Sequence, residues 1–79
     1  MTSIEKLIKK FLENPKSLTY NEIEKIMLKS GFVVKWWKWS HKKVKNTKTN
    51  KSIMIPIHNN DCTRVYKEDL REAYINNQK

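Results

Sequence analysis

The spacing of the apolar residues changes twice along this chain, and the two changes set the order of its elements. Up to Ser30 the apolar residues recur every three or four positions, as on one face of a helix. From Phe32 to Ile57 they stand at alternate positions, which is typical of strands with one buried face. After Tyr66 the helical spacing returns. The sequence therefore predicts an α+β chain in which helices precede and follow a group of strands.

Two helices are expected before the strands. Thr2-Ser3-Ile4-Glu5 has the form of a capping box, and Asn14-Pro15 ends the first helix. In the second helix Thr19 can cap the N-terminus, with Glu22 three residues later, and Gly31 suits a left-handed C-terminal cap. The apolar residues of the first helix are Ile4, Leu7, Ile8, Phe11 and Leu12, and those of the second are Ile23, Ile26 and Met27.

Three strands and a last helix are expected next. Phe32, Val34 and Trp36 form the core face of the first strand. The second strand runs from about Ser40 to Lys45, and a polar turn follows at 46–51. The core face of the third strand is Ile53, Ile55 and Ile57, with Pro56 at an edge or at the strand's end. The last helix begins near Val65 or Tyr66, and its apolar side is Tyr66, Leu70, Ala73 and Tyr74. The predicted order is ααβββα in one domain, residues 1–79, with the helices on one face of an antiparallel sheet.

The charge of the chain favours a polyanionic partner. Its 17 Lys and Arg outnumber 8 Asp and Glu, for a net charge of +9, which suits a nucleic acid, an anionic membrane surface or an acidic protein. No apolar run approaches the roughly 18 residues that a membrane span needs. Lys9, Lys10 and Glu13 also interrupt any signal-peptide core. With Glu5 and Lys6 they give the first helix a face of mixed charge, so a membrane surface is the weaker idea and no membrane partner is expected.

Cysteine and glycine usage excludes several classes of protein. The single cysteine, Cys62, rules out an internal disulfide and fits a cytoplasmic protein, and we expect it to be a loop thiol without a role. Two histidines and one cysteine without ligand spacing make a structural zinc site improbable, so no metal and no cofactor are expected. With one glycine the chain has no glycine-rich phosphate loop, which disfavours a nucleotide-driven enzyme.

The segment 31–58 holds three tryptophans, many lysines and both histidines. Lysines attract phosphate, exposed tryptophans stack on bases, and an imidazole moves protons near neutral pH. Together they favour a protein that binds RNA and cuts it. Trp37 and Trp39 are the candidates for base stacking, and Trp39 is equally open to a second use, as an apolar patch that a partner protein covers.

The second strand supplies the candidate chemistry. If Val44 faces the helices, alternation puts His41, Lys43 and Lys45 together on the opposite face. An imidazole beside two ammonium groups can take the proton of an RNA 2′-hydroxyl while the cations stabilise the phosphorane. His58 is a second imidazole that could protonate the leaving oxygen, although capping its loop is the favoured role. The alternative for the lysines is that they only keep a small protein soluble.

Four short stretches carry a resemblance to a known family. They are Asn14-Pro15-Lys16-Ser17, Glu22 to Phe32 with its end Lys29-Ser30-Gly31-Phe32, Ser40-His41, and Ile55-Pro56-Ile57-His58-Asn59. In this order and spacing the chain resembles the HicA-like toxins of bacterial and archaeal toxin–antitoxin systems. The resemblance covers nearly the whole chain, and it differs in two places: the glycine of the family's Gly-Ser-His motif is Trp39 here, and Lys42 and Lys43 follow the histidine where family members often carry aromatic or aliphatic residues.

The resemblance implies a fold like a double-stranded-RNA-binding domain and a cytoplasmic endoribonuclease that cleaves mRNA. By likeness His41 is the catalytic residue. Ser40 would position it or bind phosphate, and Lys42, Lys43 and Lys45 would bind the RNA backbone. A HicB-like antitoxin would silence the protein, which would be a monomer or dimer when free and a hetero-oligomer with the antitoxin. Two alternatives remain from the residues alone: a non-catalytic RNA-binding module, and a small inhibitor or interaction protein of a mobile element.

Overall fold

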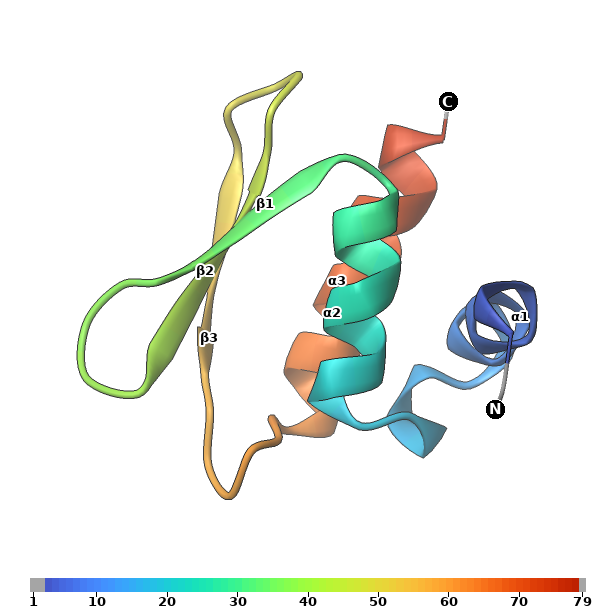
Figure 1. Cartoon of the computed structure of the whole chain (residues 1–79), viewed down its shortest axis with the longest axis horizontal. Coiled ribbons are helices and arrows are strands. Elements are labelled where there is room, and N and C mark those ends of the chain that lie inside the picture. Colours follow the sequence, from blue (N-terminus) through green and yellow to red (C-terminus); the bar gives the residue numbers. More distant parts are fainter. Residues whose placement is uncertain (1–2, 79) are drawn as a thin grey trace.

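The computed structural model describes residues 3–78, and the expected ααβββα order is confirmed (Figure 1). The elements are α1 (Ile4–Glu13), the 3₁₀ helix η1 (Pro15–Ser17), α2 (Tyr20–Lys29), β1 (Phe32–Trp36), β2 (His41–Asn46), β3 (Ser52–Pro56) and α3 (Arg64–Asn77). Helix η1 is an addition to the prediction. Figure 1 shows α2 and α3 against one face of the sheet, with α1 on the far side of that helix pair. Among the helices of residues 3–78, none covers the other face of the sheet.

The helix ends follow local sequence rules. Ser3 caps α1, since its Oγ accepts the Lys6 N–H at 3.3 Å, whereas Thr2 lies outside the described residues. The capping box of α2 is confirmed: Glu22 Oε1 accepts the Thr19 N–H at 3.0 Å, and Thr19 Oγ1 accepts the Glu22 N–H at 3.4 Å. Gly31, just after α2, has φ 94°, a conformation in which a side chain would be strained. These ends fix where the helical part stops and the sheet begins.

The register of the sheet defines two faces. Strand β2 lies between β1 and β3 and is antiparallel to both, with Val34 opposite Val44 and His41 opposite Pro56. Val44 is 2% exposed, so it lies on the face that packs on the helices, the inner face. Because side chains alternate along a strand, His41, Lys43 and Lys45 lie on the other, outer face. Pro56 is the last residue of an edge strand, as expected.

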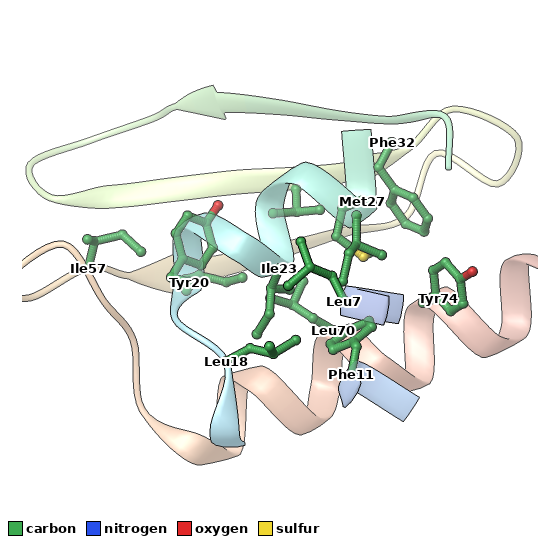
Figure 2. Packing of buried hydrophobic residues seen from close by; sticks show 13 residues of the cluster. Leu7, Phe11, Leu18, Tyr20, Ile23, Met27, Phe32, Ile57, Leu70 and Tyr74 are labelled. Carbon is green, nitrogen blue, oxygen red and sulfur yellow. The ribbon is translucent and has the colours of Figure 1, made fainter. Parts of the chain in front are cut away.

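One hydrophobic core joins all three α-helices to the inner face (Figure 2). Phe11 of α1 meets Tyr74 of α3 edge to face, with ring centroids 5.8 Å apart and an interplanar angle of 73°. The cluster of buried side chains comprises Leu7, Phe11, Leu18, Tyr20, Ile23, Ile26, Met27, Phe32, Val44, Ile55, Ile57, Leu70 and Tyr74. The core therefore holds β2 from its inner side and leaves its outer side free.

Asp61, in the connection between β3 and α3, joins the starts of two helices. Its Oδ1 accepts the Tyr20 N–H at 2.9 Å and the Cys62 N–H at 2.8 Å, and Lys67 Nζ lies 3.2 Å away. Burial pushes the pKa of Asp61 upward, but these two N–H donors and the Lys67 ammonium outweigh it and hold the pKa below its usual value. The carboxylate thus ties α2 and α3 together at the end of the sheet.

The prediction that Trp36 belongs to the core is wrong, since 63% of this residue is exposed. Alternation does put Trp36 on the inner face, opposite Lys42. However, the end of β1 and the loop after it extend away from the helices (Figure 1), and Trp36 belongs neither to the core cluster nor to the apolar side chains packed against it. The ammonium of Lys42 lies 4.7 Å from the ring centroid instead.

Candidate nucleic-acid interface

The outer face of the sheet carries an open hollow of about 450 Å³. Two residues each from β1, from β2 and from the turn after β2 line it: Val33 and Lys35, Lys43 and Lys45, and Thr47 and Asn50. Lys35 is directly opposite Lys43 in the register, and Val33 is opposite Lys45. We call Lys35, Lys43 and Lys45 the outer-face lysines.

The outer-face lysines repel one another. Side chains directly opposite on neighbouring strands have Cβ atoms about 5 Å apart, and like charges in that position are destabilising. Within residues 3–78 the two ion pairs are Lys42–Glu24 and Lys67–Asp61, and neither includes an outer-face lysine. A polyanion that lies along this face would relieve the repulsion, and an RNA backbone carries its charges in such a line.

His41 lies at one end of the same face. It is the first residue of β2 and is half-buried, and the expectation that it shares a face with Lys43 and Lys45 is confirmed. Its backbone is held on both sides: its N–H donates to the Lys38 carbonyl at 2.8 Å, and its carbonyl accepts the Trp37 N–H at 2.9 Å. The backbone that carries the imidazole is therefore fixed at the end of β2, two residues before Lys43, which lines the hollow.

Ser40 is an exposed loop residue immediately before β2, which begins one residue later than expected. Its carbonyl accepts the Ile57 N–H at 2.8 Å, so the pairing between the strands continues past their ends. This bond fixes the backbone that carries the candidate histidine. It leaves the hydroxyl of Ser40 available to a ligand.

Lys42 is not brought together with the other candidates. It lies on the inner face, only 15% of its side chain is exposed, and its Nζ is 2.8 Å from Glu24 Oε1. The Tyr20 hydroxyl donates to the same oxygen at 3.0 Å. Burial, with Glu24 adding to it, raises the pKa of Tyr20, so this hydroxyl stays protonated. The alternation that selects His41 also separates Lys42 from it, and this signal was present in the sequence.

His58 is exposed and belongs to a tight turn. Its N–H donates to the Asp61 carbonyl at 2.8 Å and its carbonyl accepts the Asp61 N–H at 3.0 Å. Asn59 and Asn60 between them have φ values of 53° and 64°, which asparagine tolerates better than most residues. The backbone of His58 thus closes the loop, in line with its favoured role, and its side chain stands two residues beyond Pro56, the partner of His41.

The tryptophans lie on the loop that leads to His41. Trp37 is 52% exposed and Trp39 is 92% exposed, as a stacking role requires. Trp36 joins them as an exposed ring that sequence reasoning missed, because alternation alone does not show where the helices end. The three rings lie next to the candidate histidine along the chain.

Cys62 has no features of a nucleophile. It is half-buried, and its pKa is raised to about 11. Burial is the main cause, the charge of Lys67 partly opposes it, and the charge of Asp61 adds to it. At neutral pH it is therefore a protonated thiol. Across residues 3–78 no three His, Cys, Asp or Glu side chains form a group that could hold a metal ion, and no helix there is long and apolar enough to span a bilayer.

Comparisons with protein-family models, with curated proteins and with solved structures found no match to this chain. The resemblance to HicA-like toxins therefore rests on the short sequence stretches described above.

Proposed function

We propose that this chain is a metal-independent endoribonuclease that binds RNA on the outer face of its sheet and uses His41 as general acid/base. One observation carries the proposal: His41 shares an open face with Lys43 and Lys45, on a strand whose other side is packed in the core. The arrangement puts a proton-transfer group at one end of a line of phosphate-binding groups.

The reaction needs only these groups and the RNA itself. His41 takes the proton of a 2′-hydroxyl, and the 2′-oxygen attacks the adjacent phosphorus. The bond from phosphorus to the 5′-oxygen breaks, which leaves a 2′,3′-cyclic phosphate on one fragment. The leaving 5′-oxygen receives a proton, from the imidazolium or from water, and becomes a 5′-hydroxyl. Lys43 and Lys45 stabilise the extra negative charge on the phosphorane.

The biological setting comes from the sequence resemblance. It supports the toxin of a type II toxin–antitoxin pair, acting on mRNA in the cytoplasm and silenced by a HicB-like antitoxin. Such an inhibitor would cover the outer-face lysines with acidic side chains. Ser40 would position His41 or contact a phosphate. We leave Lys42 out of the backbone-binding set because its ammonium is paired with Glu24 on the inner face.

One observation favours a second candidate, a non-catalytic RNA-binding module. Trp39 stands in the place of the glycine of the Gly-Ser-His motif, two residues before His41, and it is 92% exposed. A ring in that position can hold RNA by stacking without any cleavage. Such a module would bind RNA on the same basic face but would not cleave it. The remaining alternative is a small inhibitor or interaction protein encoded by a mobile element, which would bind an acidic protein with the same basic face.

The test is incubation of the purified protein with a long mRNA in excess chelator, beside His41→Ala. We expect cleavage by the wild type and none by the variant. Cleavage by both would reject His41 as the catalytic residue. Binding without cleavage by either protein would support the RNA-binding module, and an absence of RNA binding would reject both readings.

A further inference from the structure

All three tryptophans of the chain gather around the β1–β2 connection, at 37–40. They are 63%, 52% and 92% exposed for Trp36, Trp37 and Trp39, whereas large apolar side chains elsewhere mostly enter the core. Figure 1 shows this connection projecting from the sheet, away from the helices. We call Trp36, Trp37 and Trp39 the tryptophan platform.

Both the backbone conformation and the exposure of Trp39 are unfavourable for a tryptophan. Its backbone has φ 56°, in the left-handed region that bulky residues avoid and glycine enters freely. The turn is closed by the His41 N–H, which donates to the Lys38 carbonyl at 2.8 Å. A large ring at such a point is both strained and exposed, and packing in the folded chain explains neither. Residues held in unfavourable backbone conformations often serve binding.

Trp36 and Trp37 are held by cations. Lys42 Nζ lies 4.7 Å from the Trp36 ring centroid and 5.3 Å from that of Tyr20, and its bond to Glu24 fixes it to α2. Lys38 Nζ lies 5.1 Å from the Trp37 ring centroid. Each contact modestly favours one orientation of its ring in the free protein. This gives Lys42 a positioning role in place of a phosphate contact.

The tryptophan platform is joined to the basic face. The Trp37 N–H donates to the His41 carbonyl at 2.9 Å, and Lys35 of the outer face directly precedes Trp36 in the chain. A strand of RNA whose phosphates follow the outer-face lysines therefore reaches Trp37, which pairs with His41, and the exposed Trp39 as it passes His41. Trp36 lies on the inner side of the same connection, beside Lys42. In a duplex the base faces are covered by their neighbours, so only unpaired bases can lie on the rings.

We propose that the tryptophan platform stacks unpaired bases and restricts this site to single-stranded RNA. The inference rests on the proposed RNA binding at the outer face and adds the class of RNA. Charge favours RNA over a protein as the occupant: ammonium groups accompany two of the three rings, and lysine is depleted at protein–protein interfaces. A cation beside an aromatic ring is common where nucleic-acid single strands bind.

Intrinsic fluorescence reads the platform directly, because the chain has no other tryptophan. The probes are a single-stranded RNA with 2′-O-methyl groups, which cannot be cleaved, a blunt duplex of the same sequence and length, and inorganic polyphosphate. We expect the single strand to quench the fluorescence and bind most tightly. Polyphosphate, which has charge but no bases, should bind without comparable quenching.

Variants then separate stacking from charge. Trp37→Ala with Trp39→Ala should weaken single-strand binding about fivefold to a hundredfold and change duplex binding less than twofold. Leu28→Ala, at a half-exposed apolar residue on α2, is the matched control and should change neither. Trp39→Gly, which relieves the backbone, guards against loss of folding and should also weaken single-strand binding.

The outcomes distinguish the two proposals. Equal affinity for single strand and duplex, or single-strand binding that survives all these variants, would overturn the inference and leave RNA binding by the lysines intact. An absence of salt-dependent binding to either RNA would overturn the proposed function together with the inference. An unchanged RNA affinity with loss of binding to an acidic protein would assign the rings to a protein partner and reject the inference.

Discussion

Trp39, which stands where the Gly-Ser-His motif of the HicA-like toxins that this chain resembles has glycine, has a left-handed backbone conformation. A left-handed φ is open to glycine without penalty, which fits the glycine that HicA-like toxins have at this place. With tryptophan there, the same turn holds a large ring in solvent next to His41. A tryptophan in place of glycine therefore gives this turn a large exposed side chain.

Trp39→Gly should leave the fold at least as stable as the wild type. Relief of the left-handed conformation gives about 1–2 kcal/mol, and the freedom of glycine in the unfolded chain takes back about half of it. We expect the free energy of unfolding in urea to be unchanged or to rise by about 1 kcal/mol. A clear fall would mean that the ring packs in the folded protein, against the account of the platform.

The lowered pKa of Asp61 predicts that the stability of the fold depends on pH. Its pKa is lower in the folded chain than in the unfolded one, so its contribution is present above the unfolded value, about 4, and is lost as the pH falls through the folded value. Asp61→Asn keeps an oxygen for the Tyr20 N–H but leaves the buried ammonium of Lys67 without its counter-charge.

At pH 7 Asp61→Asn should lower the free energy of unfolding by roughly 1–2 kcal/mol, a range reduced because the carboxylate is partly exposed. Urea denaturation from pH 7 down to pH 2 should show this difference shrinking below about pH 4. A difference that stays constant over the whole range would mean that the charge of Asp61 does not matter.

At the scale of elements, β2 has a different task on each face. Val44 and Lys42 belong to the inner face, one in the core and one paired with Glu24, while His41, Lys43 and Lys45 face outward. Substitutions on the outer face should therefore change binding and leave stability nearly unaltered.

Lys43→Ala should weaken RNA binding at every sequence and lower the slope of log affinity against log salt by about one. Lys9→Ala removes the same charge from α1, on the far side of the helices from the sheet (Figure 1), and serves as the control. Filter binding or anisotropy over a range of salt concentrations gives both slopes. Equal slopes for the two variants would show that RNA binding depends only on the net charge of the protein and not on lysines at the outer face.

Elements governed by local rules could be predicted from the sequence. The Thr19–Glu22 capping box, the left-handed Gly31 and the alternation through Val44 all depend on near neighbours, and the structure has each of them. Alternation also gave the shared face of His41 and the lysines. It failed for Trp36, because the distance that the helices extend over the sheet depends on contacts between distant segments. The same limit hid the pairing of Lys42 with Glu24, 18 residues apart.

At the scale of the whole molecule, core and candidate site occupy opposite sides of one sheet. The helices bury the inner face, which leaves a rigid outer surface whose side chains are free to serve a ligand. In a chain with a net charge of +9 that surface carries lysines without carboxylate partners among the described residues. The arrangement separates the core from the candidate site, so variants of the candidate site should remain folded and can be compared directly with the wild type.

The most direct test of the account is the chemistry of the RNA ends that the wild-type protein produces in excess chelator. A histidine that activates the 2′-hydroxyl predicts fragments with a 2′,3′-cyclic phosphate and a 5′-hydroxyl, and no such fragments from His41→Ala. Fragments with 5′-phosphate ends, which require water as the nucleophile, or cyclic-phosphate fragments formed equally by the variant, would contradict the central claim.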